Sequence, residues 1–119
     1  MENQFEERIQ AEIVSFFWNN YPATRGHIFH VPNGGYRNAR EGAKLRSIGV
    51  IAGVPDLCIV WNGKCSWVEL KTIEGKLSSV QKEIHLKWLL QGISVFTAYG
   101  KDEAINHIMA LISEDSIIF

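Results

Sequence analysis

Two carboxylates and one ammonium group are the residues of this chain whose spacing points most directly to chemistry. Asn62-Gly63 is a strong signal for a two-residue turn between two β-strands. In the register that such a turn imposes, Asp56 faces Glu69, with Cβ atoms about 5 Å apart. Lys71 lies two residues past Glu69, on the same face and about 7 Å along the strand. The three charged groups are therefore predicted to meet at one end of a hairpin.

Two hypotheses explain this charged cluster. Two close carboxylates repel each other, and one of them takes up a proton unless a cation binds between them. Oxygen ligands with open positions suit Mg²⁺ or Mn²⁺, which lower the pKa of bound water and stabilise charge on a phosphate. Lys71 would then position the attacking water or neutralise developing negative charge. The alternative is a partly buried ion pair of Lys71 with Glu69 or Asp56, and spacing alone leaves both hypotheses open.

The rest of this hairpin face is apolar and includes both cysteines of the chain. Cys58 is expected opposite Trp67 and Cys65 opposite Val60. The two cysteines are then diagonal neighbours at about 7–8 Å, too far apart for an unstrained disulfide. We therefore predict free, packed thiols, as expected for a cytoplasmic protein.

Hydrophobic periodicity and turn signals divide the chain into alternating helices and strands. Ile9, Ile13, Phe16 and Phe17 share one face of the first helix. The final helix has Asp102 available as its N-cap. The predicted order is helix 4–19, strand 27–31, basic helix 37–48, strands 56–61 and 64–71, helix 78–91, strand 93–99 and helix 102–113. Helices between strands predict an α/β fold with a mixed central sheet flanked by helices.

Length and composition fit one compact domain spanning residues 1–119. The chain is 46% hydrophobic and 21% charged, and it has no apolar run long enough to span a membrane. Its N-terminus is polar and acidic, unlike a secretory signal. The net charge is −1, yet residues 25–46 hold five positive residues and one negative residue. This segment either binds a phosphate backbone or forms a solvated helix face.

Several motifs together resemble a known nuclease family. Pro55-Asp56 followed by Glu69-Leu70-Lys71 resembles the PD-(D/E)xK nuclease signature. The surrounding motifs are similar, in order, to the VRR-NUC (virus-type replication-repair nuclease) family: His30-Val-Pro-Asn-Gly-Gly35, Arg37, Gly49, Gly53-Val-Pro-Asp-Leu57, Val68-Glu-Leu-Lys71, Gly75-Lys-Leu-Ser-Ser-Val-Gln81 and Gly92. The similarity covers roughly residues 5 to 100. The chain thus resembles a stand-alone VRR-NUC domain of the viral or bacterial kind.

This resemblance implies a restriction-endonuclease-like PD-(D/E)xK core and Mg²⁺- or Mn²⁺-dependent cleavage of DNA. Small stand-alone members resemble Holliday-junction resolvases and act as homodimers, which implies branched DNA as the partner and a role in replication, recombination or repair. The expected location is the cytoplasm of a bacterial cell or of a phage-infected host. The alternatives are a nuclease for flaps, single strands or plain duplex, and a DNA-binding module of the same fold that does not cleave.

The resemblance also assigns roles to individual residues. Asp56, Glu69 and the backbone carbonyl of Leu70 would be metal ligands, and Lys71 would assist the attacking water. Gln81 corresponds to a glutamine near the site in this family. Gln81 also completes a capping box with Ser-Ser-Val before it, and the two roles are compatible.

The first helix is expected to supply one further acid to the site. Glu6 projects onto the same face as Ile13 and Phe17, whereas Glu7 and Glu12 lie off the centre of that face. We therefore select Glu6. The alternative is that Glu6 simply favours the helix dipole in the first turn.

The expected DNA contacts lie in a glycine-containing loop and in the basic segment after it. Small residues and exposed amides in the loop would let a phosphate approach closely, although they would also form an ordinary turn. Whether His85, one turn beyond Gln81, is structural or near the site stays open. The predicted contacts are His30, Asn33, Gly34, Gly35, Arg37, Arg40, Lys44 and Arg46.

Overall fold

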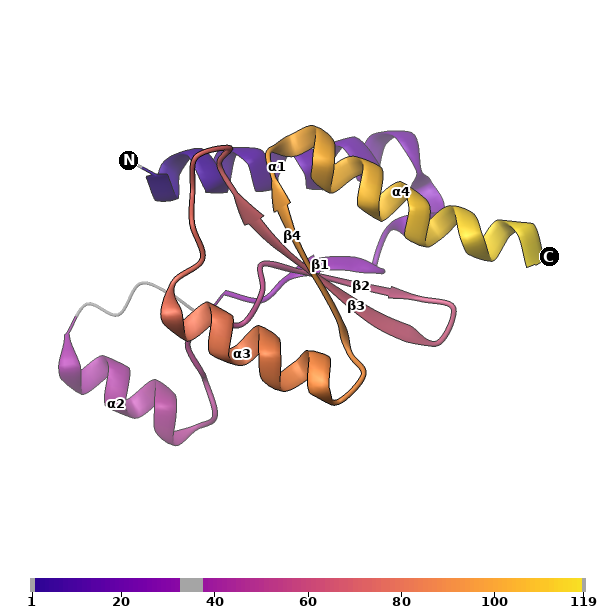
Figure 1. Cartoon of the computed structure of the whole chain (residues 1–119). Coiled ribbons are helices and arrows are strands. Elements are labelled where there is room, and N and C mark those ends of the chain that lie inside the picture. Colours follow the sequence, from indigo (N-terminus) through magenta and orange to yellow (C-terminus); the bar gives the residue numbers. More distant parts are fainter. Residues whose placement is uncertain (1, 33–37, 119) are drawn as a thin grey trace.

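A computed structural model of the chain describes residues 2–32 and 38–118 (Figure 1). The predicted DNA contacts Asn33, Gly34, Gly35 and Arg37 lie outside the described residues. The elements, in chain order, are α1 (Glu2–Asn20), a short 3₁₀ turn η1 (Pro22–Thr24), β1 (Ile28–His30), α2 (Ala39–Ser47), β2 (Leu57–Trp61), β3 (Lys64–Lys71), α3 (Ser79–Leu90), β4 (Ser94–Tyr99) and α4 (Lys101–Ile118).

The four strands form one mixed sheet in the order β1-β2-β3-β4. The strand β2 is antiparallel to both β1 and β3, and β3 is parallel to β4. A parallel pair needs a crossover connection, which α3 supplies. The predicted α/β fold with a mixed sheet flanked by helices is confirmed.

The hairpin of β2 and β3 has the predicted register, running from Trp61 opposite Lys64 to Leu57 opposite Val68. Asn62 and Gly63 both have positive φ, 52° and 74°, as a tight two-residue hairpin turn requires. The strand β2 begins at Leu57, so the prediction that it begins at Asp56 was wrong by one residue.

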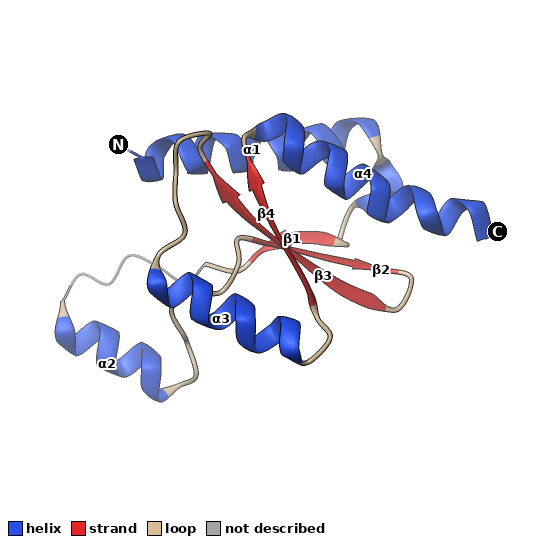
Figure 2. Cartoon of the chain, in the orientation of Figure 1, coloured by secondary structure: helices blue, strands red, loops and turns tan. Residues whose placement is uncertain are grey.

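The helices cover the two faces of the sheet unequally. Figure 2 shows α1 and α4 side by side along one face and α3 on the opposite face, while α2 projects to the side. The core lies between the sheet and the pair α1 and α4. It contains Ile13, Phe17, Leu57, Ile59, Val68, Leu70, Ala98, Ala104, Ile108 and Ile112.

Two local predictions were wrong. The helix α4 begins at Lys101, directly after Gly100 with its φ of 93°, so Asp102 lies in the first turn and is not the N-cap. Both cysteines are free as predicted, but only Cys58 is buried. Cys65 is exposed because it lies in the second position of β3, beside the hairpin turn.

Among the described residues, no helix is long and apolar enough to cross a membrane.

Candidate active site

The structure brings Asp56 and Glu69 together at the end of the hairpin. Asp56 precedes β2, and its Oδ2 accepts a hydrogen bond of 2.7 Å from the backbone N–H of Leu70. This bond turns the Asp56 carboxyl towards β3, where it also hydrogen-bonds the carboxyl of Glu69. The Glu69 side chain is buried, with an exposed fraction of 2%. The predicted meeting of these two carboxyls is therefore present in the structure.

The surroundings of Glu69 disfavour its charged form. Burial raises its pKa well above the ordinary value, and the hydrogen bond that the protonated Glu69 carboxyl donates to Asp56 and the negative charge of Asp56 raise it further. Glu6 adds a smaller effect in the same direction, while the positive charge of Lys71 opposes it. A site that holds two carboxyls this close gains stability from a bound proton or from a cation.

Helix α3 contacts both oxygens of the Glu69 carboxyl. The Gln81 side-chain amide donates to Oε2 at 3.4 Å, and the His85 Nε2 lies 3.3 Å from Oε1. His85 is buried, and this burial lowers its pKa. The contact with His85 was not predicted, although its spacing of four residues from Gln81 places both side chains on one helix face.

Gln81 also closes the N-terminus of α3. Its backbone N–H donates to Ser78 Oγ at 3.1 Å, and its side-chain oxygen accepts from the Ser78 N–H at 2.9 Å. The side-chain NH₂ group stays available for Glu69 because the capping bond uses the amide oxygen. The capping role and the position near the site therefore occur together.

Glu6 is the acid of the first helix that reaches the cluster. Its carboxylate lies 3.8 Å from Lys71 Nζ, and both side chains are largely buried. Glu7 is exposed, and Glu12 pairs with Lys101 at 3.4 Å. The helical wheel thus selected the acid that the fold places beside Lys71.

His30 lies beside the backbone of Asp56. Its Nδ1 is 2.6 Å from the carbonyl oxygen of Asp56. Because a carbonyl oxygen only accepts, Nδ1 carries the hydrogen, and Nε2 is the acceptor of the neutral ring. The ring is exposed, so His30 lies at the border of the cluster, with its position held by β1.

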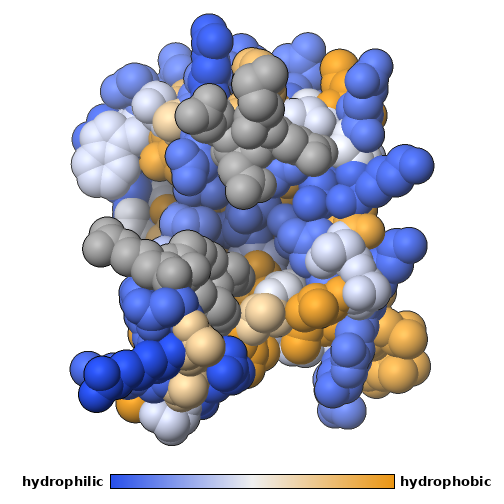
Figure 3. Space-filling model, turned by 90° about the vertical axis from the view of Figure 1, so that its left-hand side faces the viewer, coloured by the Kyte–Doolittle hydropathy of each residue, from blue (hydrophilic) through white to orange (hydrophobic). Residues whose placement is uncertain are grey.

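The other predicted DNA contacts that the structure describes lie on α2. Arg40, Lys44 and Arg46 are all exposed. The helix begins after Asn38, whose side chain accepts from the Glu41 N–H at 2.8 Å. Figure 3 shows hydrophilic side chains lining a hollow between the upper part of the molecule, which holds α1, and the lower part, which holds α2 and α3. The basic residues therefore lie on a projecting element and are not part of the carboxyl cluster.

The oxygen atoms of the cluster fit a hard divalent cation. The protein would not surround such a cation with side chains alone: among the residues that the structure describes, no group of three or more His, Cys, Asp and Glu is spaced to hold a metal ion. Mg²⁺ usually binds through one or two carboxylates and fills its other positions with water and phosphate oxygens. Asp56 and Glu69 provide two such carboxyls, and the carbonyl of Leu70 stays a predicted third ligand. A cation bound there would take the place of the proton that the raised pKa of Glu69 favours.

A solved structure described as "VRR_NUC domain protein" has the same architecture. It matches with a TM-score of 0.76 and 24% sequence identity, over 91% of this chain and 88% of that chain. The chain has the VRR-NUC fold. The restriction-endonuclease-like fold class expected from the motifs is thereby confirmed. No protein-family model matches the sequence, and no curated protein matches it. The roles of the individual site residues stay predictions.

Proposed function

We propose that this protein is a DNA endonuclease that depends on Mg²⁺ or Mn²⁺ and hydrolyses phosphodiester bonds. The observation that carries the proposal is the pairing of the Asp56 and Glu69 carboxyls beside Lys71, at the end of one hairpin. The fold supports it, because the solved structure that shares this fold is described as a "VRR_NUC domain protein", and the motifs of this chain resemble the VRR-NUC family of nucleases.

The proposed hydrolysis assigns a separate role to each charged residue of the cluster. A divalent cation bound by Asp56 and Glu69 would lower the pKa of a water and offset phosphate charge. Lys71, held by Glu6 at 3.8 Å, positions the attacking water and balances the negative charge that develops on the phosphate. Water attacks phosphorus directly and gives up one proton to the solvent, so no covalent bond to the enzyme forms. The bond from phosphorus to the leaving oxygen breaks, and that oxygen takes up one proton from the solvent.

We further propose that the substrate is branched DNA and that the enzyme acts as a homodimer, as in Holliday-junction resolution. Two symmetric cuts need two sites related by a two-fold axis. Exposed apolar side chains on and just after α3, which a second copy would cover, support this proposal: Leu86, Leu89, Leu90 and Ile93. Light scattering of the purified protein measures its mass. A monomer at the concentrations that give paired cuts would contradict the dimer.

Cleavage of labelled DNA tests the proposed chemistry. The panel contains a four-way junction, a flap, a nicked duplex, a plain duplex and a single strand, each with Mg²⁺, Mn²⁺ or EDTA. Asp56→Asn and Lys71→Met are expected to abolish cleavage. Lys64→Met is the matched control, because Lys64 is exposed at the opposite end of β3. Full activity of Asp56→Asn would refute the proposed mechanism, and tight binding without any product would indicate a non-cleaving module.

A further inference from the structure

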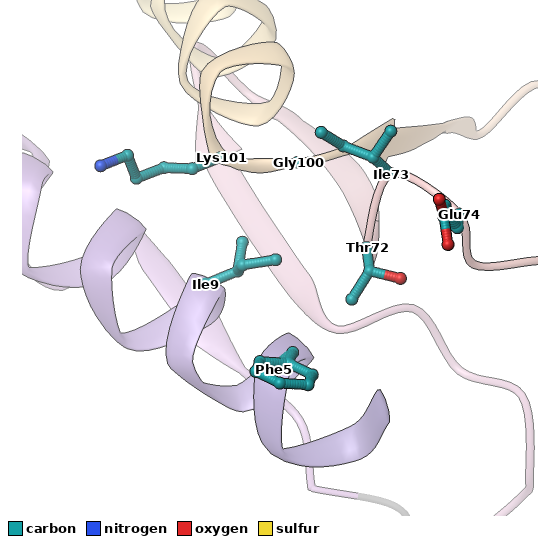
Figure 4. A pocket seen from close by; sticks show the side chains of 7 residues that line it. All are labelled: Phe5, Ile9, Thr72, Ile73, Glu74, Gly100 and Lys101. Carbon is teal, nitrogen blue, oxygen red and sulfur yellow. The ribbon is translucent and has the colours of Figure 1, made fainter. Parts of the chain in front are cut away.

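An open cavity of about 820 Å³ is lined by Phe5 and Thr72, the chain neighbours of the ion-paired residues Glu6 and Lys71. Figure 4 shows its walls: α1, the segment that follows β3, and the start of α4. Phe5 precedes Glu6 in the chain, and Thr72 follows Lys71. A ligand that touches Phe5 and Thr72 in this cavity is therefore one residue along the chain from Glu6 and Lys71, whose carboxylate and Nζ are 3.8 Å apart.

The cavity has apolar walls, two of which are exposed side chains. Phe5 has an exposed fraction of 52% and Ile73 of 81%, and Figure 4 shows Ile9 on the same helix as Phe5, across from Thr72 and Ile73. The Ile73 side chain is close to Gly100, where an added Cβ would lie 3.5 Å from its Cγ1. Exposed aromatic and aliphatic side chains grouped around a cavity typically mark a binding surface.

Polar groups border these apolar walls. Thr72, Glu74 and Lys101 line the cavity, and Lys101 Nζ lies 3.4 Å from the carboxylate of Glu12. Apolar walls with a few polar groups at the border suit a flat heterocycle with hydrogen-bonding edges. An aromatic side chain such as Phe5 accepts any nucleobase by stacking, because every base presents a π-face.

We propose that this cavity binds the base of an unpaired nucleotide that flanks the cleaved phosphate. The inference rests on the proposed nuclease function and narrows its substrate class. With the base against Phe5 and Ile73, the adjoining phosphate would be directed towards Lys71, which precedes the lining residue Thr72 and carries a complementary positive charge. A base in an intact duplex must first leave its stack, which costs free energy. The cavity therefore selects branch points, flaps and single strands over plain duplex.

Fluorescence of 2-aminopurine in a short single-stranded oligonucleotide tests this site without cleavage. Measured in EDTA, the wild type is expected to quench the probe by stacking, and Phe5→Ala is expected to lose the quenching and to bind the strand about tenfold more weakly. Phe5→Tyr should retain both. Trp18→Ala is the matched control, because Trp18 is equally exposed on the same helix, at 53%, but lies outside the cavity. Affinity for plain duplex should be the same in all variants.

A second variant covers the case in which Phe5→Ala does not fold. Ile73→Ser changes the most exposed wall of the cavity and is also expected to weaken single-strand binding while leaving duplex binding unchanged. Unchanged quenching and affinity in the folded variants would overturn the inference. A shift of Phe5→Ala from dimer to monomer, with single-strand binding intact, would also overturn it and assign the cavity to a second copy of the chain. Absence of cleavage by the wild type would refute the nuclease function instead.

Discussion

The Nε2 of His85 lies 3.3 Å from one carboxyl oxygen of Glu69, while Gln81, one helical turn earlier, contacts the other oxygen. Two side chains of helix α3 thus contact the two oxygens of the Glu69 carboxyl. A carboxylate held in this way presents its remaining lone pairs in a fixed direction, as partners around metal ligands commonly do. The packing of α3 on the sheet therefore sets the orientation of a predicted metal ligand.

The contact between His85 and Glu69 predicts that His85→Ala binds metal more weakly. Without the imidazole, Glu69 turns more freely, and affinity for Mn²⁺ is expected to fall roughly 10- to 100-fold. Electron paramagnetic resonance of free Mn²⁺ measures this affinity directly, and the Mn²⁺ dependence of cleavage should shift by the same factor. His85→Gln, which can still donate a hydrogen bond, is expected to recover most of the affinity. Wild-type Mn²⁺ affinity in a folded His85→Ala protein would contradict this role.

The ion pair of Glu6 with Lys71 predicts a difference between adjacent acids. In Glu6→Gln, the Lys71 ammonium loses the carboxylate 3.8 Å away that holds it, and the cleavage rate is expected to fall roughly 100-fold through misplacement. Glu7→Gln, at an exposed position one residue along α1, should cleave like the wild type. Single-turnover rates at saturating metal make the comparison. Equal rates in the two variants would exclude a role for Glu6 in the site.

We predict that alanine at Gly53 lowers the free energy of unfolding more than alanine at Gly49. Both have positive φ, 87° and 100°, so alanine at either position costs about 1 kcal/mol in backbone strain. At Gly53, an added Cβ would lie 2.9 Å from the Val80 carbonyl oxygen and 3.2 Å from Ile84 Cγ1, whereas nothing lies within 4 Å at Gly49.

Gly53→Ala must therefore also displace α3, which adds about 1–3 kcal/mol of destabilisation. Urea unfolding of the two variants measures the difference. A Gly53→Ala protein as stable as Gly49→Ala would mean that the loop before Asp56 does not pack closely on α3.

The sequence was most informative where local chemistry decides the structure. The turn Asn62-Gly63 fixes the register of the hairpin, and the register alone brings Asp56 to Glu69. The helical period of α1 likewise pointed to Glu6 among three acids. In both cases, backbone geometry over a few residues determines where the side chains lie.

Tertiary packing explains what the sequence left open or mispredicted. The place of His85 depends on how α3 lies on the sheet, which no local pattern states. The exposure of Cys65 depends on how much of the hairpin the helices cover. The cavity beside Phe5 forms from three segments far apart in the chain, so it could not be predicted from any one of them.

We predict that protonation of His107, which lies outside the candidate active site, makes the stability of the fold depend on pH. Its ring stacks on Phe96 with centroids 3.9 Å apart and planes at 5°, and its buried Nε2 has no hydrogen-bond partner within the described part of the chain. Burial lowers its pKa below 6.5, so the folded state holds the neutral ring. The unfolded chain binds the proton more readily, and stability therefore falls as the pH drops below about 6.5.

A neutral replacement isolates this contribution from those of other titrating groups. Between pH 7.5 and 5.5, the wild type should lose more unfolding free energy than His107→Phe, which keeps the ring stacked on Phe96 but cannot take up a proton. Urea denaturation at the two pH values gives both differences. If His107→Phe loses as much stability as the wild type over this range, the imidazole is protonated equally in the folded and unfolded states, and its burial does not control its charge.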